Sequence, residues 1–244
     1  MSWSVAGYAA IPAIVMLAMA ATSLVRAPGA MVQSAILHLA AGVIFAVVAV
    51  EFLPDLVHRH AVLETGIGFV AGAALMMAIR AWSEARAGDE DDATAGSAAG
   101  LPVAFLFATG VDLAIDGLML GIGFAAGAQQ GALLTIGLAI ELAALGCAAT
   151  AALARGGFAS REVLAWIALL ATTFFASALG GSALLSLLSD RVLAVLLAFG
   201  SAALLFLVTE ELLTEAHEVE ETPLLTASFF AGFLVLFLLE LMQR

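Results

Sequence analysis

The stretch VDLAIDGLMLGIGFAAG, residues 111–127, decides the fold class. It ends an apolar run, residues 102–127, in which Asp112 and Asp116 are the charged residues. A run of this length is typical of a helix that crosses a lipid bilayer, which needs about 20 apolar residues. We therefore predict a transmembrane helix that carries two carboxylic acids near its middle.

Similar apolar runs fill the rest of the chain. We expect eight spans, near residues 5–25, 32–53, 64–83, 102–127, 131–154, 162–185, 191–213 and 223–242. Helices are expected because lipid offers no hydrogen-bond partner to an unpaired backbone amide. The runs also lack the alternation of apolar and polar residues that strands of a β-barrel show. The predicted fold class is all-α: a polytopic membrane protein with eight transmembrane helices in a bundle, forming a single domain over residues 1–244.

The composition excludes several other classes of protein. Of the 244 residues, 64% are hydrophobic and 11% are charged, whereas soluble domains average about 45–50% and about 25%. Eight basic residues, all Arg, face twenty acidic ones, for a net charge of −12, which argues against nucleic-acid binding. The single Cys147 lies in an apolar run, so a disulfide framework is excluded.

The polar segments between the runs predict the orientation of the chain. Residues 84–100, EARAGDEDDATAGSAAG, are expected to form a mobile acidic linker. Arginines are more numerous after the odd-numbered spans than on the opposite side, which places the odd-numbered loops, including 84–100, in the cytoplasm. We thus predict a bacterial-type inner membrane protein with both termini outside. The arginines counted are Arg26, Arg80, Arg86, Arg155 and Arg161 against Arg59, Arg191 and Arg244.

A third acid, Glu141, lies in the middle of the fifth span. An ionisable side chain at such a depth costs at least about 2.5–3.5 kcal/mol and therefore points to a function. Asp112 and Asp116 lie one turn apart on one face of their helix. Spans four and five contain no Arg, Lys or His that could pair with the three acids. If the acids converge, they either bind a cation or hold protons.

Other polar residues lie near the span ends and predict entry and exit steps for a cation. The candidates for this transport path are His38, Glu51, Glu210, Glu211 and His217. Glycines at Gly117 and Gly146 each follow one of the midspan acids by five positions. A glycine in a transmembrane helix lets a neighbouring backbone approach closely, so both are expected at helix contacts.

Four stretches of the chain resemble the ZIP (Zrt/Irt-like) family of metal transporters. They are AAGVIFAVVAVEFLPDLV with the following GIGFVAGAALMMAIRAW, the polar loop 84–100, VDLAIDGLMLGIGFAAG, and GSAALLFLVTEELLTEAHE. They are similar, in turn, to the family's glycine-rich second helix, its variable cytoplasmic loop, its fourth-helix His-Asn-x-Pro-Glu-Gly motif and its seventh helix. The family also has eight spans with both ends outside.

The resemblance implies a central metal site. Asp112 stands where the family has His, Asp116 where it has Glu, and Glu141 at the first position of the fifth-helix motif. The three would be metal ligands. Leucines replace other family ligands at Leu113, Leu142 and Leu145, so a single site is expected. Three carboxylates favour hard ions such as Mn²⁺, Mg²⁺, Ca²⁺ or Fe²⁺, whereas the resemblance implies zinc, iron or manganese. Zinc, manganese and iron therefore stay open.

These inferences predict a carrier for divalent metal ions that works by alternating access, with lipid, metal ions and protons as partners and a homodimer allowed. The metal is the transported substrate, and no tightly bound cofactor is expected. An enzyme is not expected, because the sequence has no nucleophile–base pair at a plausible spacing and no phosphate-binding loop. Two alternatives stay open: a proton-coupled carrier of a small organic solute, and a non-transporting scaffold that has lost its ligands.

Overall fold

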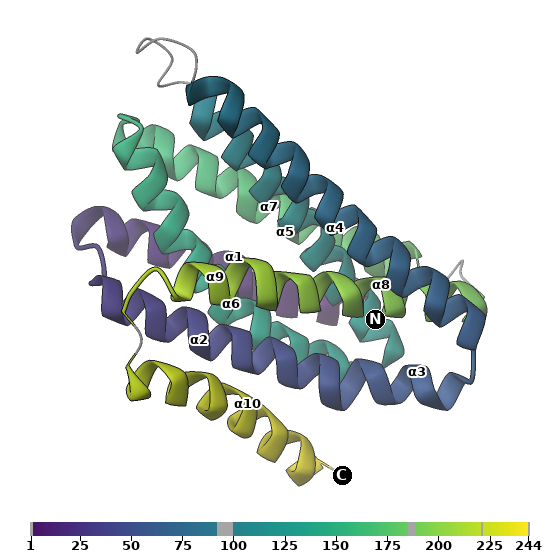
Figure 1. Cartoon of the computed structure of the whole chain (residues 1–244). Coiled ribbons are helices and arrows are strands. Elements are labelled where there is room, and N and C mark those ends of the chain that lie inside the picture. The colour runs from purple at the N-terminus through teal and green to yellow at the C-terminus, as the bar shows by residue number, and fades with distance from the viewer. Residues whose placement is uncertain (1, 92–99, 185–188, 221, 244) are drawn as a thin grey trace.

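The computed structural model describes residues 2–91, 100–184, 189–220 and 222–243 (Figure 1). All the regular elements in these ranges are helices, as predicted. In chain order they are α1 (Ser2–Val25), α2 (Ala30–Val47), the π-helix η1 (Val48–Phe52), α3 (Leu53–Arg59), α4 (Val62–Asp91), α5 (Gly100–Ala126), α6 (Ala128–Arg155), α7 (Ser160–Leu184), α8 (Asp190–Phe206), the π-helix η3 (Leu207–Leu212), α9 (Leu213–Ala216) and α10 (Pro223–Gln243).

Seven helical segments within the described residues are long and apolar enough to cross a membrane. They are Val5–Val25, Ala30–Arg59, Val62–Trp82, Ala128–Arg155, Ser160–Ala183, Asp190–Ala216 and Pro223–Met242. The chain is therefore a multi-pass, all-helical protein. The predicted fourth span is also helical, as α5, but its crossing of the membrane, and with it the count of eight, stays a prediction.

The helices form an inner and an outer group. The segments Ala30–Arg59, Ala128–Arg155 and Asp190–Ala216 are largely buried inside the protein, whereas α1, α4, α7 and α10 turn most of their surface outward. The outward surface is apolar, as a helix that faces lipid requires. Both termini lie toward the same end of the bundle (Figure 1).

The pairing of the helices repeats within the chain. Helix α2 packs along α10 while α8 packs along α4, and α1 packs along α6 while α7 packs along α5. The order α1, α2, α4 is thus matched by α7, α8, α10, with α5 and α6 between the two groups. Helices α2 and α8 run in opposite directions (Figure 1). This is the arrangement of an inverted repeat, in which two halves of a chain have opposite orientations.

Glycines set the closest of these helix contacts, as expected for packing in lipid. A Cβ atom on Gly117 would lie 2.2 Å from the carbonyl oxygen of Phe174 in α7, and one on Gly146 would lie 2.6 Å from that of Met16 in α1. The prediction that both glycines lie at helix contacts is confirmed. Backbone carbonyls cannot yield as a side chain can, so α5 is fixed against α7 and α6 against α1.

The predicted span boundaries differ from the helix ends by up to three residues at most positions, and by more after residues 53 and 83. Helix α4 continues to Asp91, so the first half of the predicted linker 84–100 is helical, while residues 92–99 lie outside the described residues. Five of these eight residues are Ala, Glu or Arg, which are strong helix formers and extend an existing helix at little cost. The second and seventh spans also continue, to Arg59 and Ala216 in place of 53 and 213, each through a π-helical turn.

The π-helical turn η1 has a local cause. Pro54 lies in the first turn of α3 and has no backbone N–H to donate to the carbonyl of Val50. Its ring also crowds that carbonyl. The helix therefore widens locally into a π-helical turn and does not end. The chain therefore remains helical beyond Pro54, although the span was predicted to end at residue 53.

Candidate functional site

Helix α5 carries the first two acids of the site on one face. Asp116 is buried, with 2% of its surface exposed, and Asp112 is half-buried one turn earlier. The glycines at Gly117 and Gly121 lie against α7. This contact fixes the rotation of α5, and with it the direction in which the two acids point.

Glu141 joins them from α6, where 2% of its surface is exposed. Asp112, Asp116 and Glu141 each offer one carboxylate oxygen, and these three atoms lie within 4.8 Å of one another. Oxygens bound to one ion at 2.0–2.6 Å stand at most about 5 Å apart. The convergence of the three predicted acids thus matches the dimensions of a metal site. We call them the carboxylate triad.

The triad is incompletely satisfied by the protein itself. Asp116 Oδ2 and Glu141 Oε2 are buried and have no hydrogen-bond partner. The two carboxyl groups also lie within hydrogen-bonding distance of each other, which requires a shared proton when no cation is present. The ion pairs that the structure describes, Arg59–Asp55, Arg80–Glu210 and Arg191–Glu64, lie outside the triad.

The electrostatic cost of this arrangement is large. At 4.8 Å and an effective dielectric constant of about 20, two unit negative charges repel by roughly 3–4 kcal/mol. Three fully charged carboxylates would therefore accumulate about 10 kcal/mol, which is comparable to the whole stability of a typical protein. A cation or bound protons must neutralise most of this charge.

A fourth carboxylate, Glu211, approaches the triad from η3. Its charge acts on Asp112, Asp116 and Glu141 alike. From Glu211 the series continues along η3 and α9, because Glu211 neighbours Glu215, which in turn neighbours Glu218. The spacing of four residues between Glu211 and Glu215 places both on one helical face. Acidic groups thus lead from the buried triad to the end of α9.

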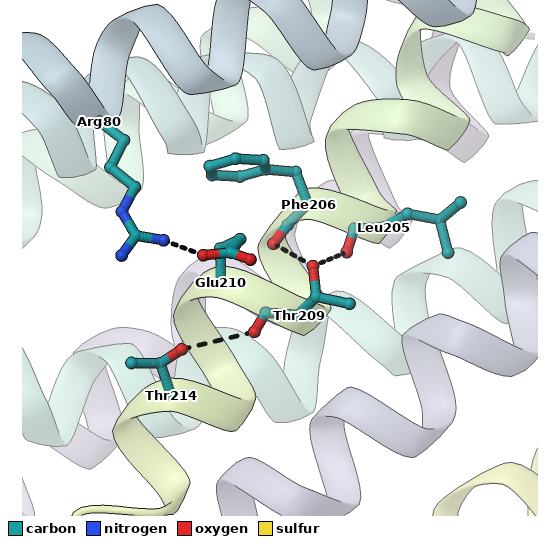
Figure 2. A network of polar contacts seen from close by, with 6 residues as sticks. All are labelled: Arg80, Leu205, Phe206, Thr209, Glu210 and Thr214. Atoms are coloured by element: carbon teal, nitrogen blue, oxygen red, sulfur yellow. Dashed lines mark hydrogen bonds and ion pairs between the residues drawn. The ribbon is translucent and has the colours of Figure 1, made fainter.

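Threonine hydroxyls bond to backbone carbonyls along the π-helix η3. Thr209 Oγ1 donates to the carbonyl of Leu205 at 2.9 Å, and Thr214 Oγ1 donates to the carbonyl of Thr209 at 3.4 Å (Figure 2). On the same turn, Glu210 accepts a hydrogen bond from Arg80 of α4 (Figure 2). The two adjacent acids on η3 therefore differ: Glu210 is hydrogen-bonded to Arg80, whereas Glu211, whose charge Arg80 also influences, acts on the triad.

The two predicted path histidines lie beside each other. The ring of buried His38 meets that of His217 edge-on, with centroids 5.2 Å apart. His38 Nδ1 lies 2.9 Å from the carbonyl oxygen of Ser34, and His217 Nδ1 contacts the carbonyl of Leu213. A carbonyl can only accept, so Nδ1 carries the hydrogen in both rings. The pair lies where α2 meets α9, at the outer end of the acidic series.

Glu51, the remaining path candidate, is buried in η1. Within the described residues, the triad is the group of three or more side chains that could hold a metal ion, and Glu51 is not part of it. Glu51 in η1 and Glu211 in η3 occupy matching places in the two halves of the repeat, each four residues before another acid, Asp55 or Glu215. Arg80 is the site residue that sequence reasoning did not assign, since it was interpreted only as a charge that orients the protein.

A cavity of about 580 Å³ lies on the other side of α5, between α4 and α7. Val111, Ala114 and Ile115, which alternate with the two acids along the helix, belong to its walls. The walls are almost wholly apolar, so this cavity cannot compensate the desolvation of a cation. The chemistry therefore belongs to the triad.

The chain shows no significant match to protein-family models or to curated proteins.

Proposed function

We propose that the protein carries divalent metal cations across a membrane, with the carboxylate triad as the binding site. The observation that carries the proposal is the convergence of Asp112, Asp116 and Glu141, with buried oxygens on Asp116 and Glu141 that have no protein partner. A cation supplies both the missing partner and the missing charge. Carboxylate oxygens are hard ligands, which favours Mn²⁺ or Fe²⁺ and allows Zn²⁺.

The proposal includes the topology and the path. Eight spans with both termini outside a bacterial-type inner membrane, as in the ZIP family that the sequence resembles, would place the acidic series at the cytoplasmic end. The cation leaves the triad past Glu211 toward Glu215, with His38 and His217 at the end of the path. Rocking of the two halves of the repeat about α5 and α6 would supply alternating access.

Uptake into vesicles tests the proposal. The purified protein in liposomes should accumulate Mn²⁺, Fe²⁺ or Zn²⁺ above empty liposomes, and the double variant Asp112→Asn/Asp116→Asn should reduce uptake to that background. The amides keep the size of the side chains but remove the charge that binds the cation. Equal uptake by the wild type and the double variant would reject the site.

The affinity should depend on pH. Protons and the cation compete for the same carboxylate oxygens, so binding requires deprotonated ligands. Lowering the pH from about 7.5 to about 5.5 should weaken Mn²⁺ binding by roughly tenfold or more, and binding should release protons into a weakly buffered solution. Calorimetric titration in buffers of different ionisation enthalpy measures both effects. An affinity that stays constant over this range would contradict carboxylate ligation.

A further inference from the structure

Helix α4 brings a positive charge to the acidic path. Arg80 Nη1 donates to Glu210 Oε2 across the gap between α4 and η3 (Figure 2). The guanidinium also acts on Glu211, the next residue. Glu211 is the carboxylate between the triad and Glu215, so Arg80 stands beside the point that a cation must pass.

We propose that Arg80 is a tethered counter-cation of the path, which neutralises the acids of η3 when no metal ion is there and yields to a metal ion that passes Glu211. This inference rests on the proposed function, because it assigns a role in cation passage to Arg80. Arg80 is a positioning residue in this scheme, since it acts on the metal ion through Glu210 and Glu211.

The side chains of the ion pair can separate easily. The side chain of Arg80 is 39% exposed and that of Glu210 is 46% exposed. Arg80 lies near the end of the segment Val62–Trp82, where water is close, and ion pairs that water can reach contribute little to stability because each partner can regain its hydration. Arginine stays charged at any accessible pH, so it cannot leave the path by losing a proton. It can only swing away, and its long side chain permits this.

The backbone beneath the pair is held much more firmly. A Cβ atom on Gly68 would lie 2.2 Å from the carbonyl oxygen of Val195, and one on Gly72 would lie 2.4 Å from that of Phe199. Helix α4 is therefore packed against α8, the helix that continues into η3. With the two backbones fixed, Arg80 stays within reach of Glu210 and Glu211, and the switch is confined to side chains.

The guanidinium of Arg80 and a metal ion compete for the same acids of η3. Removing the arginine and removing its partner acid should therefore change the affinity for Mn²⁺ in opposite directions. Removing the guanidinium in Arg80→Gln leaves the acids of η3 available to a metal ion, so Mn²⁺ should bind more tightly. Removing the carboxylate in Glu210→Gln lets the guanidinium turn to Glu211, so Mn²⁺ should bind more weakly. A plain clamp between α4 and η3 would be broken by either change, and both variants would then shift the affinity in the same direction.

Calorimetric titration of the full-length protein with Mn²⁺ tests this inference. The dissociation constant should fall about three- to tenfold in Arg80→Gln and rise by a similar factor in Glu210→Gln, as expected for one unit charge near the path. The double variant should return to within about threefold of the wild type, because it removes one positive and one negative charge and leaves the net charge beside the path unchanged. Arg80→Lys, which keeps the charge, should bind as the wild type does.

Shifts in the same direction, or no shift in either single variant, would overturn the role of Arg80. Parallel titrations of the wild type and of Glu141→Gln distinguish a failure of this inference about Arg80 from a failure of the proposed function. If the wild type binds Mn²⁺ and Glu141→Gln does not, the triad is retained as the binding site, whatever the Arg80 variants show. If the wild type itself fails to bind Mn²⁺, both the carrier proposal and the inference about Arg80 are rejected.

Discussion

Replacing Glu141 by Gln should lower the affinity for Mn²⁺ by about a hundredfold or more, while the cation-free protein becomes more stable. Loss of a partner outside the coordination shell already costs about 10–100-fold in affinity, so loss of a ligand should reach at least the upper end of that range. Glu141 is buried and supplies one of the three converging oxygens. A glutamine of the same shape keeps an oxygen there but lacks the charge.

The gain in stability has a separate cause. Glu141 lies within hydrogen-bonding distance of Asp116, and its Oε2 is buried without a hydrogen-bond partner. An amide at this position donates a hydrogen bond to the Asp116 carboxylate and removes one negative charge from the cluster. If this contributes about 1 kcal/mol, the melting temperature should rise by roughly 2–4 °C. Calorimetric titration and thermal unfolding without divalent ions measure the two effects.

Asp190→Asn is the matched control for Glu141→Gln. Asp190 is an exposed acid at the first residue of α8, about 30 Å along the helix from Glu211 at 1.5 Å per residue. The affinity should not change in this variant, and the melting temperature should not rise, because Asp190 stands at a helix N-terminus where its charge is favourable. If Glu141→Gln lowered stability together with affinity, Glu141 would be a packing residue, and the assignment of a metal ligand would be wrong.

Replacing Gly121 by Ala should destabilise the protein by about 3 kcal/mol, although it adds a single methyl group. Overpacking of a well-packed interior usually costs about 1–3 kcal/mol. At Gly121 the new Cβ would lie 2.3 Å from the carbonyl oxygen of Ala178 and 2.6 Å from the amide nitrogen of Ser182, both backbone atoms of α7. The helices would have to separate, and α5 would lose the contact that orients Asp112 and Asp116.

Gly110→Ala on the same helix provides the comparison. A Cβ there would meet Leu170 Cδ2 at 3.6 Å, an ordinary van der Waals distance. Alanine favours a helix over glycine by up to about 1 kcal/mol, so this variant should be as stable as the wild type or slightly more so. Thermal unfolding in detergent ranks the three proteins. Equal melting temperatures for the two alanine variants would contradict the close approach of α5 and α7.

Much of the candidate site could be predicted from residues alone. Asp112, Asp116 and Glu141 stand out because lipid penalises every ionisable side chain, and the helical period shows that two of them share a face. The approach of Glu211 could not be predicted in this way. It depends on how η3 packs against its neighbours, which brings Glu210 to Arg80 and the charge of Glu211 to the triad. Neighbouring acids in a sequence give no sign of which one turns inward.

The sequence by itself determined that the chain is helical and multi-pass, and which acids are costly to place in a span, because both conclusions follow from the transfer of single residues into lipid. It could not determine where Arg80 lies, since residues 80 and 210 are brought together only by the packing of α4 on α8 at Gly68 and Gly72. Local hydropathy has no information about contacts over such separations. The tertiary structure decided these contacts. Glycines let particular helix backbones meet, and the backbone contacts fix the directions in which the side chains of those helices point.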